Sequence, residues 1–392
     1  MVYIEENMGS RAATLVEVLE HRRERMAGRV TIKDVAREAQ VSIKTVSNVL
    51  NNRGSMRPET RQRVEDTMRR LGYTLNVSAR AMKTGGTRLI GLGIFDFSQP
   101  FAPYLADIVI EYAKQREYGV IINTYGSGGE GLPTIIDDTY RLGADGWLFF
   151  TERPLAHKGA VLRQPYPVVL AGDYLAYGAA DAVTMPNVEA LASVVGRLID
   201  EGHERIALLG ASDVKLTGDV SSRQVCCRLS ALGERAIDAT LASPEGTQAL
   251  RVQGYAKAFV DRGMPVDWRL AITVPLWNQA GGVRAIDALL DGMNITDCPE
   301  IIVCLNDAMA FGAMHELQRR GLRVPDDVQV IGFDNVPEGQ YSVPSLTTID
   351  PHVETYARRA VDMLIERIEG YDGPARTYVT DFALVEREST RL

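Results

Sequence analysis

The chain has 392 residues, of which 45% are hydrophobic and 24% charged, as in an ordinary soluble globular protein. This length favours two or three domains with a core large enough to fold without disulfides or metal. No apolar run approaches the roughly 20 residues that span a bilayer, and the N-terminus lacks the apolar segment of a signal peptide. The four cysteines lack zinc-site spacing, so we expect a cytoplasmic protein with no membrane contact, no metal and no cofactor.

The net charge of −8 conceals a strong asymmetry along the chain. Residues 29–88 contain 13 basic and 5 acidic side chains, whereas residues 89–392 contain 26 basic and 41 acidic ones. A short basic segment attached to a large acidic body is typical of a nucleic-acid-binding head. A basic helix surface that is merely solvated would give the same charge balance.

The basic segment predicts three short helices. Thr31 and Asp34 have the spacing of a capping box at the start of the first helix, and Ser42 is placed to cap the second. Pro58 lies where the first turn of the third helix begins, and Gly72 lies where a left-handed residue would end it. The spacing of the first two helices predicts a helix-turn-helix, whose second helix enters the major groove of DNA.

The second helix carries the side chains expected to contact DNA bases. Lys44 can donate to guanine, and Asn48 can pair with adenine or with phosphate. Solubility of an exposed helix is the alternative explanation for any one of these residues. The predicted contact set comprises Thr31, Ser42, Ile43, Lys44, Thr45, Ser47 and Asn48.

The string TIKDVAREAQVSIKTVSNVLN, followed by RPETRQRV and LGY, resembles the lactose/galactose-repressor (LacI/GalR) family. The resemblance continues through NVSARAMKTGGTRLIG and across nearly all of the remaining chain. It implies a hinge helix that forms on the operator and wedges an apolar side chain, here Met82, into the minor groove. Asn76 and Ala79 belong to the same implied contact set, and Gln40 stands where the family has the glycine of the turn.

The acidic body alternates short apolar runs with helical patterns. Such alternation predicts right-handed βαβ units in parallel sheets covered by helices on both faces. Eight expected strands are too many for one small sheet, so we expect two doubly wound lobes with a ligand cleft at the strand carboxyl ends. The expected strands are 89–95, 120–125, 146–150, 167–172, 205–210, 270–275, 301–306 and 328–334, with helices at 190–202 and 308–321.

The predicted fold is therefore a small all-α helix-turn-helix head plus an α/β two-lobed body. The resemblance implies that this body is periplasmic-binding-protein-like, with strands crossing between the lobes near Asn187, near Pro351 and close to the C-terminus. The expected divisions are an extension (1–28), the head (29–75), the hinge (76–87) and the body (88–392), with an N-lobe of 89–187 and 352–380 and a C-lobe of 188–351 and 381–392.

Polar and aromatic residues at the expected strand ends form the candidate effector site. Arg251 opens RVQGY, which resembles the family's R-L-x-G-Y, and Asp334 ends GFD, which resembles G-[YF]-D. Carboxylates, a guanidinium and an indole suit a polyol, although Trp277 could belong to the core and Asp307 could be a helix N-cap. The candidate set is Asp96, Phe97, Phe101, Arg251, Trp277, Asn306 and Asp334.

One glycine-rich loop suggests a different function. Residues 126–131 match G-x-G-x-x-G after an expected strand, with Asp145 nearly 20 residues later, as in dinucleotide-binding folds. However, Asp145 precedes the next strand, whereas a ribose-binding acid would stand at its far end. The sequence also lacks G-x-S-x-G, H-E-x-x-H and a Walker lysine loop, so we expect no enzyme.

We expect an effector-gated repressor of carbohydrate-utilisation genes that binds double-stranded DNA, at a pseudo-palindromic operator, as a homodimer. The chain ends at STRL without a heptad tail, which favours a dimer over a tail-mediated tetramer. Residues 213–248 are longer than the family's usual segment and predict an extra helix near the cleft mouth. A cytoplasmic solute-binding module and, less favoured, a dinucleotide-dependent enzyme are the alternatives.

Overall fold

The chain divides into two compact units, Met1–Gly85 and Gly86–Leu392. The computed structural model describes residues 30–50, 56–73, 86–125, 132, 136, 139, 141–151, 154–211, 226–293 and 297–392. Several predicted features lie outside the described residues: the extension 1–28, the hinge positions Asn76, Ala79 and Met82, and the glycine-rich loop 126–131.

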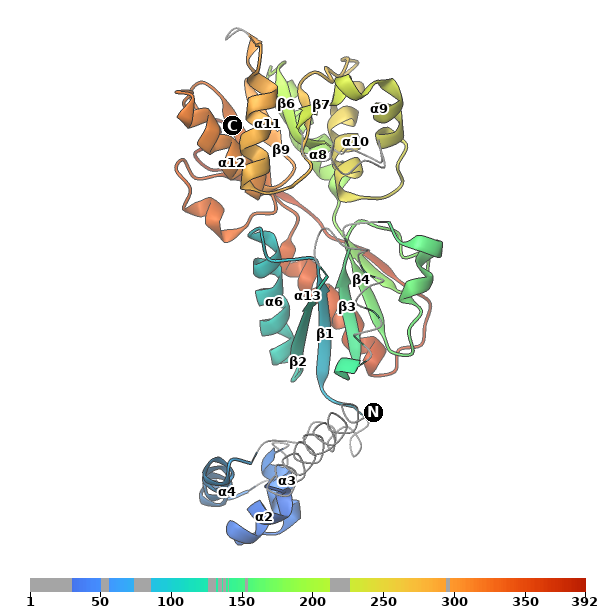
Figure 1. Cartoon of the computed structure of the whole chain (residues 1–392), viewed down its shortest axis with the longest axis vertical. Coiled ribbons are helices and arrows are strands. Elements are labelled where there is room, and N and C mark those ends of the chain that lie inside the picture. The colour runs from blue at the N-terminus through green and yellow to red at the C-terminus, as the bar shows by residue number, and fades with distance from the viewer. Residues whose placement is uncertain are drawn as a thin grey trace, which may run out of the picture. The chain divides into compact units, whose positions relative to one another are not determined.

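The first unit contains the three expected helices, α2 (Ile32–Glu38), α3 (Ile43–Leu50) and α4 (Pro58–Leu71) (Figure 1). Thr31 and Asp34 form the predicted capping box, in which the Asp34 carboxylate accepts from the Thr31 N–H at 3.0 Å. Ser42 Oγ accepts from the Thr45 N–H at 3.0 Å and so caps α3. Gln40, in the turn, and Gly72, after α4, both adopt left-handed backbone angles, with φ of 54° and 65°.

A small apolar core holds the three helices together. The helices contribute side chains that are almost fully shielded from solvent: Val35, Ala36, Ala39, Val46, Val49 and Val64. The sequence spacing of these residues places them on the inner faces of α2, α3 and α4, because residues three and four apart share one helix face. The outer faces remain polar and basic.

The second unit has two lobes, each built on its own sheet. The N-lobe sheet has the order β12-β5-β4-β3-β1-β2, and all its pairings are parallel. Helices α6 (Phe101–Gln115) and α13 (Val353–Ile368) pack against each other and against its strands. The strands are β1 (Leu89–Ile94), β2 (Gly119–Thr124), β3 (Gly146–Phe150), β4 (Val168–Ala171), β5 (Asp181–Thr184) and β12 (Thr377–Val379), and a 3-10 helix, η1 (Ala156–Leu162), precedes β4.

The C-lobe sheet has the order β13-β11-β10-β9-β6-β8-β7, with the two edge strands β13 and β7 antiparallel to their neighbours. Its helices pack in two pairs, α8 with α10 and α11 with α12. The helices are α8 (Asn187–Asp200), α9 (Glu234–Leu241), α10 (Thr247–Val260), α11 (Gln279–Leu290) and α12 (Asp307–Arg319). The strands are β6 (Ile206–Ala211), β7 (Cys227–Arg228), β8 (Ala271–Thr273), β9 (Ile301–Cys304), β10 (Gln329–Phe333), β11 (Thr347–Asp350) and β13 (Ala383–Val385), with short 3-10 helices η3 (Leu229–Leu232) and η5 (Pro337–Gln340).

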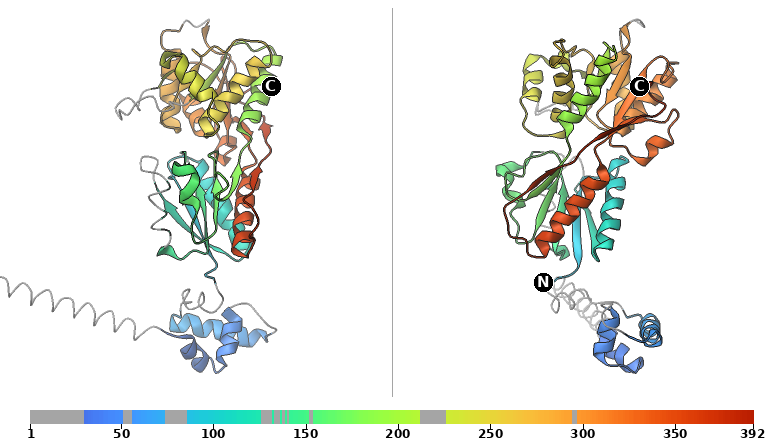
Figure 2. Two further views of the ribbon diagram at one scale, coloured as in Figure 1. Left: turned by 90° about the vertical axis from the view of Figure 1, so that its right-hand side faces the viewer. Right: turned by 180° about the vertical axis from the view of Figure 1, so that it is seen from behind.

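The chain crosses between the lobes three times: from β5 to α8, from β11 to α13, and from β12 to β13. Figure 2 shows the last crossing as the red C-terminal segment that runs from one lobe to the other. These crossings bring the carboxyl ends of both sheets to the boundary between the lobes. They therefore fix where side chains from the two lobes can meet.

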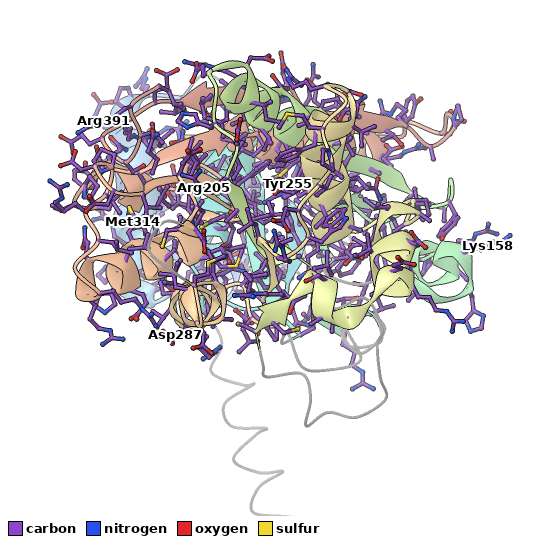
Figure 3. The ribbon with its side chains drawn as sticks, turned by 90° about the horizontal axis from the view of Figure 1, so that it is seen from above. Lys158, Arg205, Tyr255, Asp287, Met314 and Arg391 are labelled. Carbon is purple, nitrogen blue, oxygen red and sulfur yellow. The ribbon has the colours of Figure 1, made fainter. Side chains whose placement is uncertain are left out.

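Large buried side chains fill the C-lobe core between the sheet and the helices. Viewed from above in Figure 3, Tyr255 lies in the interior, while Asp287 and Arg391 lie at the margin. The Tyr255 hydroxyl donates to the carbonyl of Ile206 at 2.7 Å, which ties α10 to β6. Burial raises the pKa of Tyr255. Among the residues that the structure describes, none of the helices combines the length and apolarity needed to cross a membrane.

All eight strands expected from apolar runs are present, and β11, β12 and β13 lie near Pro351 and close to the C-terminus, where the resemblance implied crossings between the lobes. The structure also contains β5, β7, β11, β12 and β13. Three of these have only two or three residues, too few for a period to show in the sequence. The other two, DAVT and TTID, begin and end with polar residues, so neither forms an apolar run that would show in the sequence.

Candidate functional site

The outward face of α3 carries the predicted DNA-contacting residues. Ile43 is 46% exposed, and Ser42 and Lys44 are also exposed, while Val46 and Val49 on the opposite face are buried. Thr45, Ser47 and Asn48 are half-buried. The most exposed of the predicted residues thus lie at the N-terminal end of α3, where a recognition helix contacts bases, and Asn48 lies farther along the helix. The Thr31 hydroxyl donates to Asp34 at 2.7 Å and is engaged in the capping box.

A cavity of about 310 Å³ lies between the lobes of the second unit. Residues that follow β1, β3 and β4 of the N-lobe line it, together with residues that follow β8, β9 and β10 of the C-lobe. The first two turns of α10 complete its wall. This position, outside the carboxyl ends of parallel strands, is where doubly wound folds bind ligands.

Six of the seven predicted effector residues line this cavity: Asp96, Phe101, Arg251, Trp277, Asn306 and Asp334. Phe97 does not, and its side chain is 44% exposed. The reason is local, because the Asp96 carboxylate accepts from the Ser98 N–H at 2.8 Å and closes a tight turn. That turn keeps Asp96 and Ser98 in the cavity wall and leaves Phe97 outside it.

Arg251 is the most deeply buried charge at the site, with 2% of its surface exposed. Its Nε donates to Asn187 Oδ1 at 2.7 Å, and its Nη1 donates to the Leu305 carbonyl. Its guanidinium lies 3.4 Å from the centre of the Phe333 ring. Burial lowers the pKa of Arg251, and the nearby carboxylate of Asp334 opposes this effect.

Asp334 lies at the end of β10 and is also buried. Its Oδ1 is 3.7 Å from Arg251 Nη2, and its φ of 111° places the backbone in a region that side chains rarely adopt. Burial raises the pKa of Asp334 to about 7, and the charge of Asp173 adds to the rise while Arg251 opposes it. Near pH 7 the carboxyl group can therefore either donate or accept a hydrogen bond.

Asp307 is not the helix N-cap considered above, because its neighbour Asn306 caps the helix. The N-cap of α12 is Asn306, whose Oδ1 accepts from the Met309 N–H at 2.8 Å, and Asp307 is the first residue inside the helix. The fully buried Asp307 carboxylate instead accepts from the Val336 N–H at 2.8 Å and from the Thr348 hydroxyl at 2.6 Å. Asp307 thus fixes the turn after β10 that carries Asp334. Burial raises its pKa, and the charge of Asp334 adds to the rise.

Direct hydrogen bonds join the lobes around the cavity. Asp173, which follows β4 in the N-lobe, accepts from the Thr247 hydroxyl of α10 at 2.7 Å. Its backbone carbonyl accepts from the Gly246 N–H at 2.7 Å. On the other side, Asn306 Nδ2 donates to Gln99 Oε1 at 2.9 Å. These contacts join the two lobes beside the cavity.

Several lining residues were not predicted from the sequence, among them Thr151, Gly172, Asp173, Thr247, Gln248 and Tyr356. A signal for two of them was present, because Thr151 and Asp173 directly follow the expected strands 146–150 and 167–172. Thr247 also had a signal, since it lies one helical turn before Arg251 and so shares its face. Tyr356, on the N-lobe helix α13, had none.

The described part of the long segment 213–248 contains the expected extra helix, α9, which packs against α10 and η3. The residues after α9 reach the cavity region. Glu245 accepts from the Leu175 N–H of the N-lobe at 2.7 Å, beside the contact between Gly246 and Asp173. This segment therefore supplies contacts between the lobes at the cavity.

Family models match both units of the chain. Residues 31–76 match the model of bacterial regulatory proteins of the lacI family, and residues 195–390 match the periplasmic binding protein-like domain. Catabolite control protein A of Priestia megaterium is 30% identical over 321 residues, which cover 82% of this chain and 87% of that protein. The chain belongs to the lacI family of bacterial regulatory proteins. It is a transcription regulator with a helix-turn-helix DNA-binding domain and a two-lobed body.

Solved structures of lacI-family regulators share this architecture. A LacI-type transcription regulator from Bifidobacterium animalis subsp. lactis is 50% identical, with a TM-score of 0.69, and covers 78% of this chain and 100% of that chain. The lac repressor dimer bound to operator and the anti-inducer ONPF is 22% identical, with a TM-score of 0.68, and covers 92% of this chain and 99% of that one. The latter likeness shows the shared fold.

Asp145, considered above as a ribose-binding acid, has a structural role in this lacI-family body. Its carboxylate accepts from the N–H groups of Thr87 at 2.7 Å and Arg88 at 2.8 Å, at the start of β1. This position is at the amino end of the sheet, opposite the cavity. Asp145 anchors the point where the chain enters the body.

We expect Asp334→Asn to remove part of the pH dependence of folding in this regulator. In an unfolded chain an aspartate has a pKa of about 3.9, whereas Asp334 in the fold has a pKa of about 7. Between these values only the folded state holds the proton, so the free energy of unfolding falls as the pH rises. A tenfold change in proton affinity corresponds to about 1.4 kcal/mol, so the full difference of about three pKa units corresponds to ~4 kcal/mol, of which about 2–3 kcal/mol is lost between pH 5 and 8.

Urea unfolding of the wild type and Asp334→Asn between pH 5 and 8 measures this difference. The groups that face Asp334 are Arg251, Asp173, Asp307 and Asp350, and all of them remain in the variant. Glu204→Gln, which removes an exposed carboxylate, serves as the control and should follow the wild-type curve. Parallel curves for the wild type and Asp334→Asn would contradict the raised pKa.

Proposed function

We propose that this regulator represses carbohydrate-utilisation genes by binding a pseudo-palindromic operator as a homodimer, and that a carbohydrate bound between its lobes changes its affinity for DNA. The cavity between the lobes carries this proposal. Three carboxyl groups (Asp96, Asp173 and Asp334), the Arg251 guanidinium and the Trp277 indole converge there from both lobes, as suits vicinal hydroxyl groups and the apolar face of a sugar ring.

Gating follows from the position of the cavity. A ligand shifts the balance between two arrangements of the lobes only by its difference in affinity for them. The cavity is lined by both lobes, and hydrogen bonds between the lobes lie beside it. A ligand in the cavity therefore contacts both lobes at once only in this arrangement. Because a repressor binds bacterial genes directly, we infer that the protein acts in the cytoplasm.

The homodimer follows from the size of the head. One recognition helix reads one half-site, so two copies related by a two-fold axis read a pseudo-palindrome. Selection of bound sequences from a random duplex library by the full chain tests this. We expect an enriched motif with two-fold symmetry, and enrichment of no sequence or of a single half-site would contradict the proposal.

The Asn48→Ala variant in the same selection tests the reading residue. An amide paired with adenine contributes about 1–3 kcal/mol of discrimination. We therefore expect relaxed specificity at one symmetry-related pair of positions and unchanged binding to unrelated DNA. Gln62→Ala removes an exposed amide from α4 and is the matched control. Equal loss of specific and non-specific binding would remove Asn48 from the base-reading set.

A further inference from the structure

The connection between β6 and α10 is longer than the fold requires. In a doubly wound fold, a strand and the helix that follows it are usually joined by about 2–6 residues. Here β6 ends at Ala211 and α10 begins at Thr247. The described part of the connection, residues 226–246, contains β7, η3 and α9, and we call this part the strap. The C-lobe therefore carries an additional piece between a strand and its helix.

The strap is fixed to the C-lobe along its length. At its start, β7 pairs antiparallel with β8, and the Cys227 N–H donates to Thr273 Oγ1 at 3.2 Å. In its middle, α9 packs against α10 (Figure 1). Near its end, Gln253 Nε2 of α10 donates to the Ser243 carbonyl at 2.7 Å. These contacts hold the end of the strap in a defined position on the C-lobe.

The end of the strap contacts the N-lobe. The Glu245 carboxylate accepts from the Leu175 N–H at 2.7 Å, and the Gly246 N–H donates to the Asp173 carbonyl at 2.7 Å. Directly after the strap, the Thr247 hydroxyl donates to the Asp173 carboxylate at 2.7 Å. Three consecutive residues thus bond to the loop that follows β4. A segment that only covered the edge of the C-lobe sheet would need none of these bonds.

Gly246 shows how closely the strap approaches the N-lobe. It is buried, and its φ of 99° favours glycine. A Cβ at this position would lie 3.3 Å from Tyr174 Cε1 of the N-lobe, which is tighter than an ordinary contact. Gly233, just before α9, also has a positive φ, of 83°, but a Cβ there would meet no described atom within 4 Å. Glycine at position 246 therefore serves the contact between the lobes as well as the backbone.

The N-lobe side of the contact is rigid. Asp173 Oδ1 accepts from the Thr184 hydroxyl at 2.6 Å and from the Met185 N–H at 3.2 Å. Thr184 is the last residue of β5, so the Asp173 carboxylate is tied to the N-lobe sheet. The loop that carries Asp173 cannot follow the strap when the lobes move apart. Separation of the lobes must therefore break the bonds that the end of the strap makes.

We propose that the strap is a built-in latch, which holds the lobes together around the cavity before any small molecule binds. A hydrogen bond to a charged group, such as that of Glu245, shifts an equilibrium by about tenfold or more. The strap thus favours one arrangement of the lobes by itself. A ligand of the cavity then uses less of its binding free energy to bring the lobes together. The effect on DNA binding rests on the proposed function, whereas the latch does not.

Two variants release the latch, and two matched variants serve as controls. Glu245→Ala removes the acceptor for the Leu175 N–H, and Gly246→Ala places a Cβ against Tyr174. Neither position is among the described residues that line the cavity. Gly233→Ala introduces the same backbone strain without the contact, and Glu234→Ala removes an exposed carboxylate from the start of α9.

Acrylamide quenching of tryptophan fluorescence measures the separation of the lobes in the full chain, with no small molecule added. Trp277 lines the cavity from the C-lobe, so its ring becomes more accessible when the N-lobe moves away. We expect the quenching constant to rise at least about twofold in Glu245→Ala and Gly246→Ala, because each moves the equilibrium toward separated lobes. Gly233→Ala and Glu234→Ala should follow the wild type. Adding Trp277→Phe to each protein should abolish the rise.

Three results would overturn the latch. The first is unchanged quenching in both Glu245→Ala and Gly246→Ala. The second is an equal rise in Gly233→Ala or Glu234→Ala, since strain or lost charge alone would then be the cause. The third is a rise that persists with Trp277→Phe, because it would come from a tryptophan outside the cavity and so from general loosening of the fold.

Affinity for the selected duplex, measured on the same proteins, separates the latch from the proposed function. We expect Glu245→Ala and Gly246→Ala to change operator affinity in the same direction, by up to about tenfold, with unchanged binding to unrelated DNA. Increased quenching with unchanged operator affinity supports the latch but removes gating by the lobes from the proposed function. Unchanged quenching with normal operator binding overturns the latch and leaves the proposed function intact.

Discussion

Arg251→Met is expected to abolish effector binding and to destabilise the body by about 3–5 kcal/mol, because removing one partner of a buried charged network leaves the others uncompensated. The substitution removes the donor to Asn187 Oδ1 and to the Leu305 carbonyl, and the only guanidinium near Asp334 and Asp173 among the described lining residues. For a body of this size the loss corresponds to a fall in melting temperature on the order of 10 °C.

Two further variants test whether the loss of stability in Arg251→Met comes from the buried charge that it removes. Arg262→Met removes a partly exposed arginine, just after the same helix, that pairs with Asp200, and should cost no more than about 1 kcal/mol. Arg251→Met combined with Asp334→Asn should recover part of the stability, since an uncharged amide then replaces the buried carboxyl group that has lost its partner. Thermal unfolding measures all four proteins. If Arg251→Met has the same melting temperature as Arg262→Met, the buried Arg251 guanidinium does not stabilise this region.

Val46→Asp is expected to unfold the head and to abolish DNA binding without affecting the body. Val46 is fully buried in the small core between α2, α3 and α4. Burying an unpaired carboxylate costs several kcal/mol, which is comparable to the entire stability of a domain this small. The body is a separate compact unit, so its melting temperature should change by less than about 1 °C.

Hydrogen exchange of peptides from the head, together with DNA binding by the full chain, measures the effect. Lys44→Asp places the same charge on the exposed face of α3, two residues earlier. It should lose DNA binding while its head stays protected from exchange, which separates loss of a contact from loss of the fold. Retained protection in Val46→Asp, or a parallel fall in the stability of the body, would contradict the independent head.

Local sequence patterns were sufficient for the head. Thr31 and Asp34 predict their capping box, and Gly72 its left-handed turn, because each interaction spans only a few residues. The apolar positions of α3 predict which side chains are buried, since a helix has a fixed period. The same locality explains Phe97, which was expected in the cleft but is turned out of it by the hydrogen bond between Asp96 and Ser98.

In the body, the sequence by itself determined that buried strands alternate with helices, and therefore that Asn306 and Asp334 come together at strand carboxyl ends. Arg251 was added by the resemblance of RVQGY, and it lies in the second turn of α10. Only the tertiary structure decided which further residues join them. Thr151 and Trp277 lie 126 residues apart in the chain, and Tyr356 comes from a helix beyond the second crossing between the lobes. No periodic pattern records such a meeting, because it depends on how two separately folded sheets are joined by the strands that cross between them.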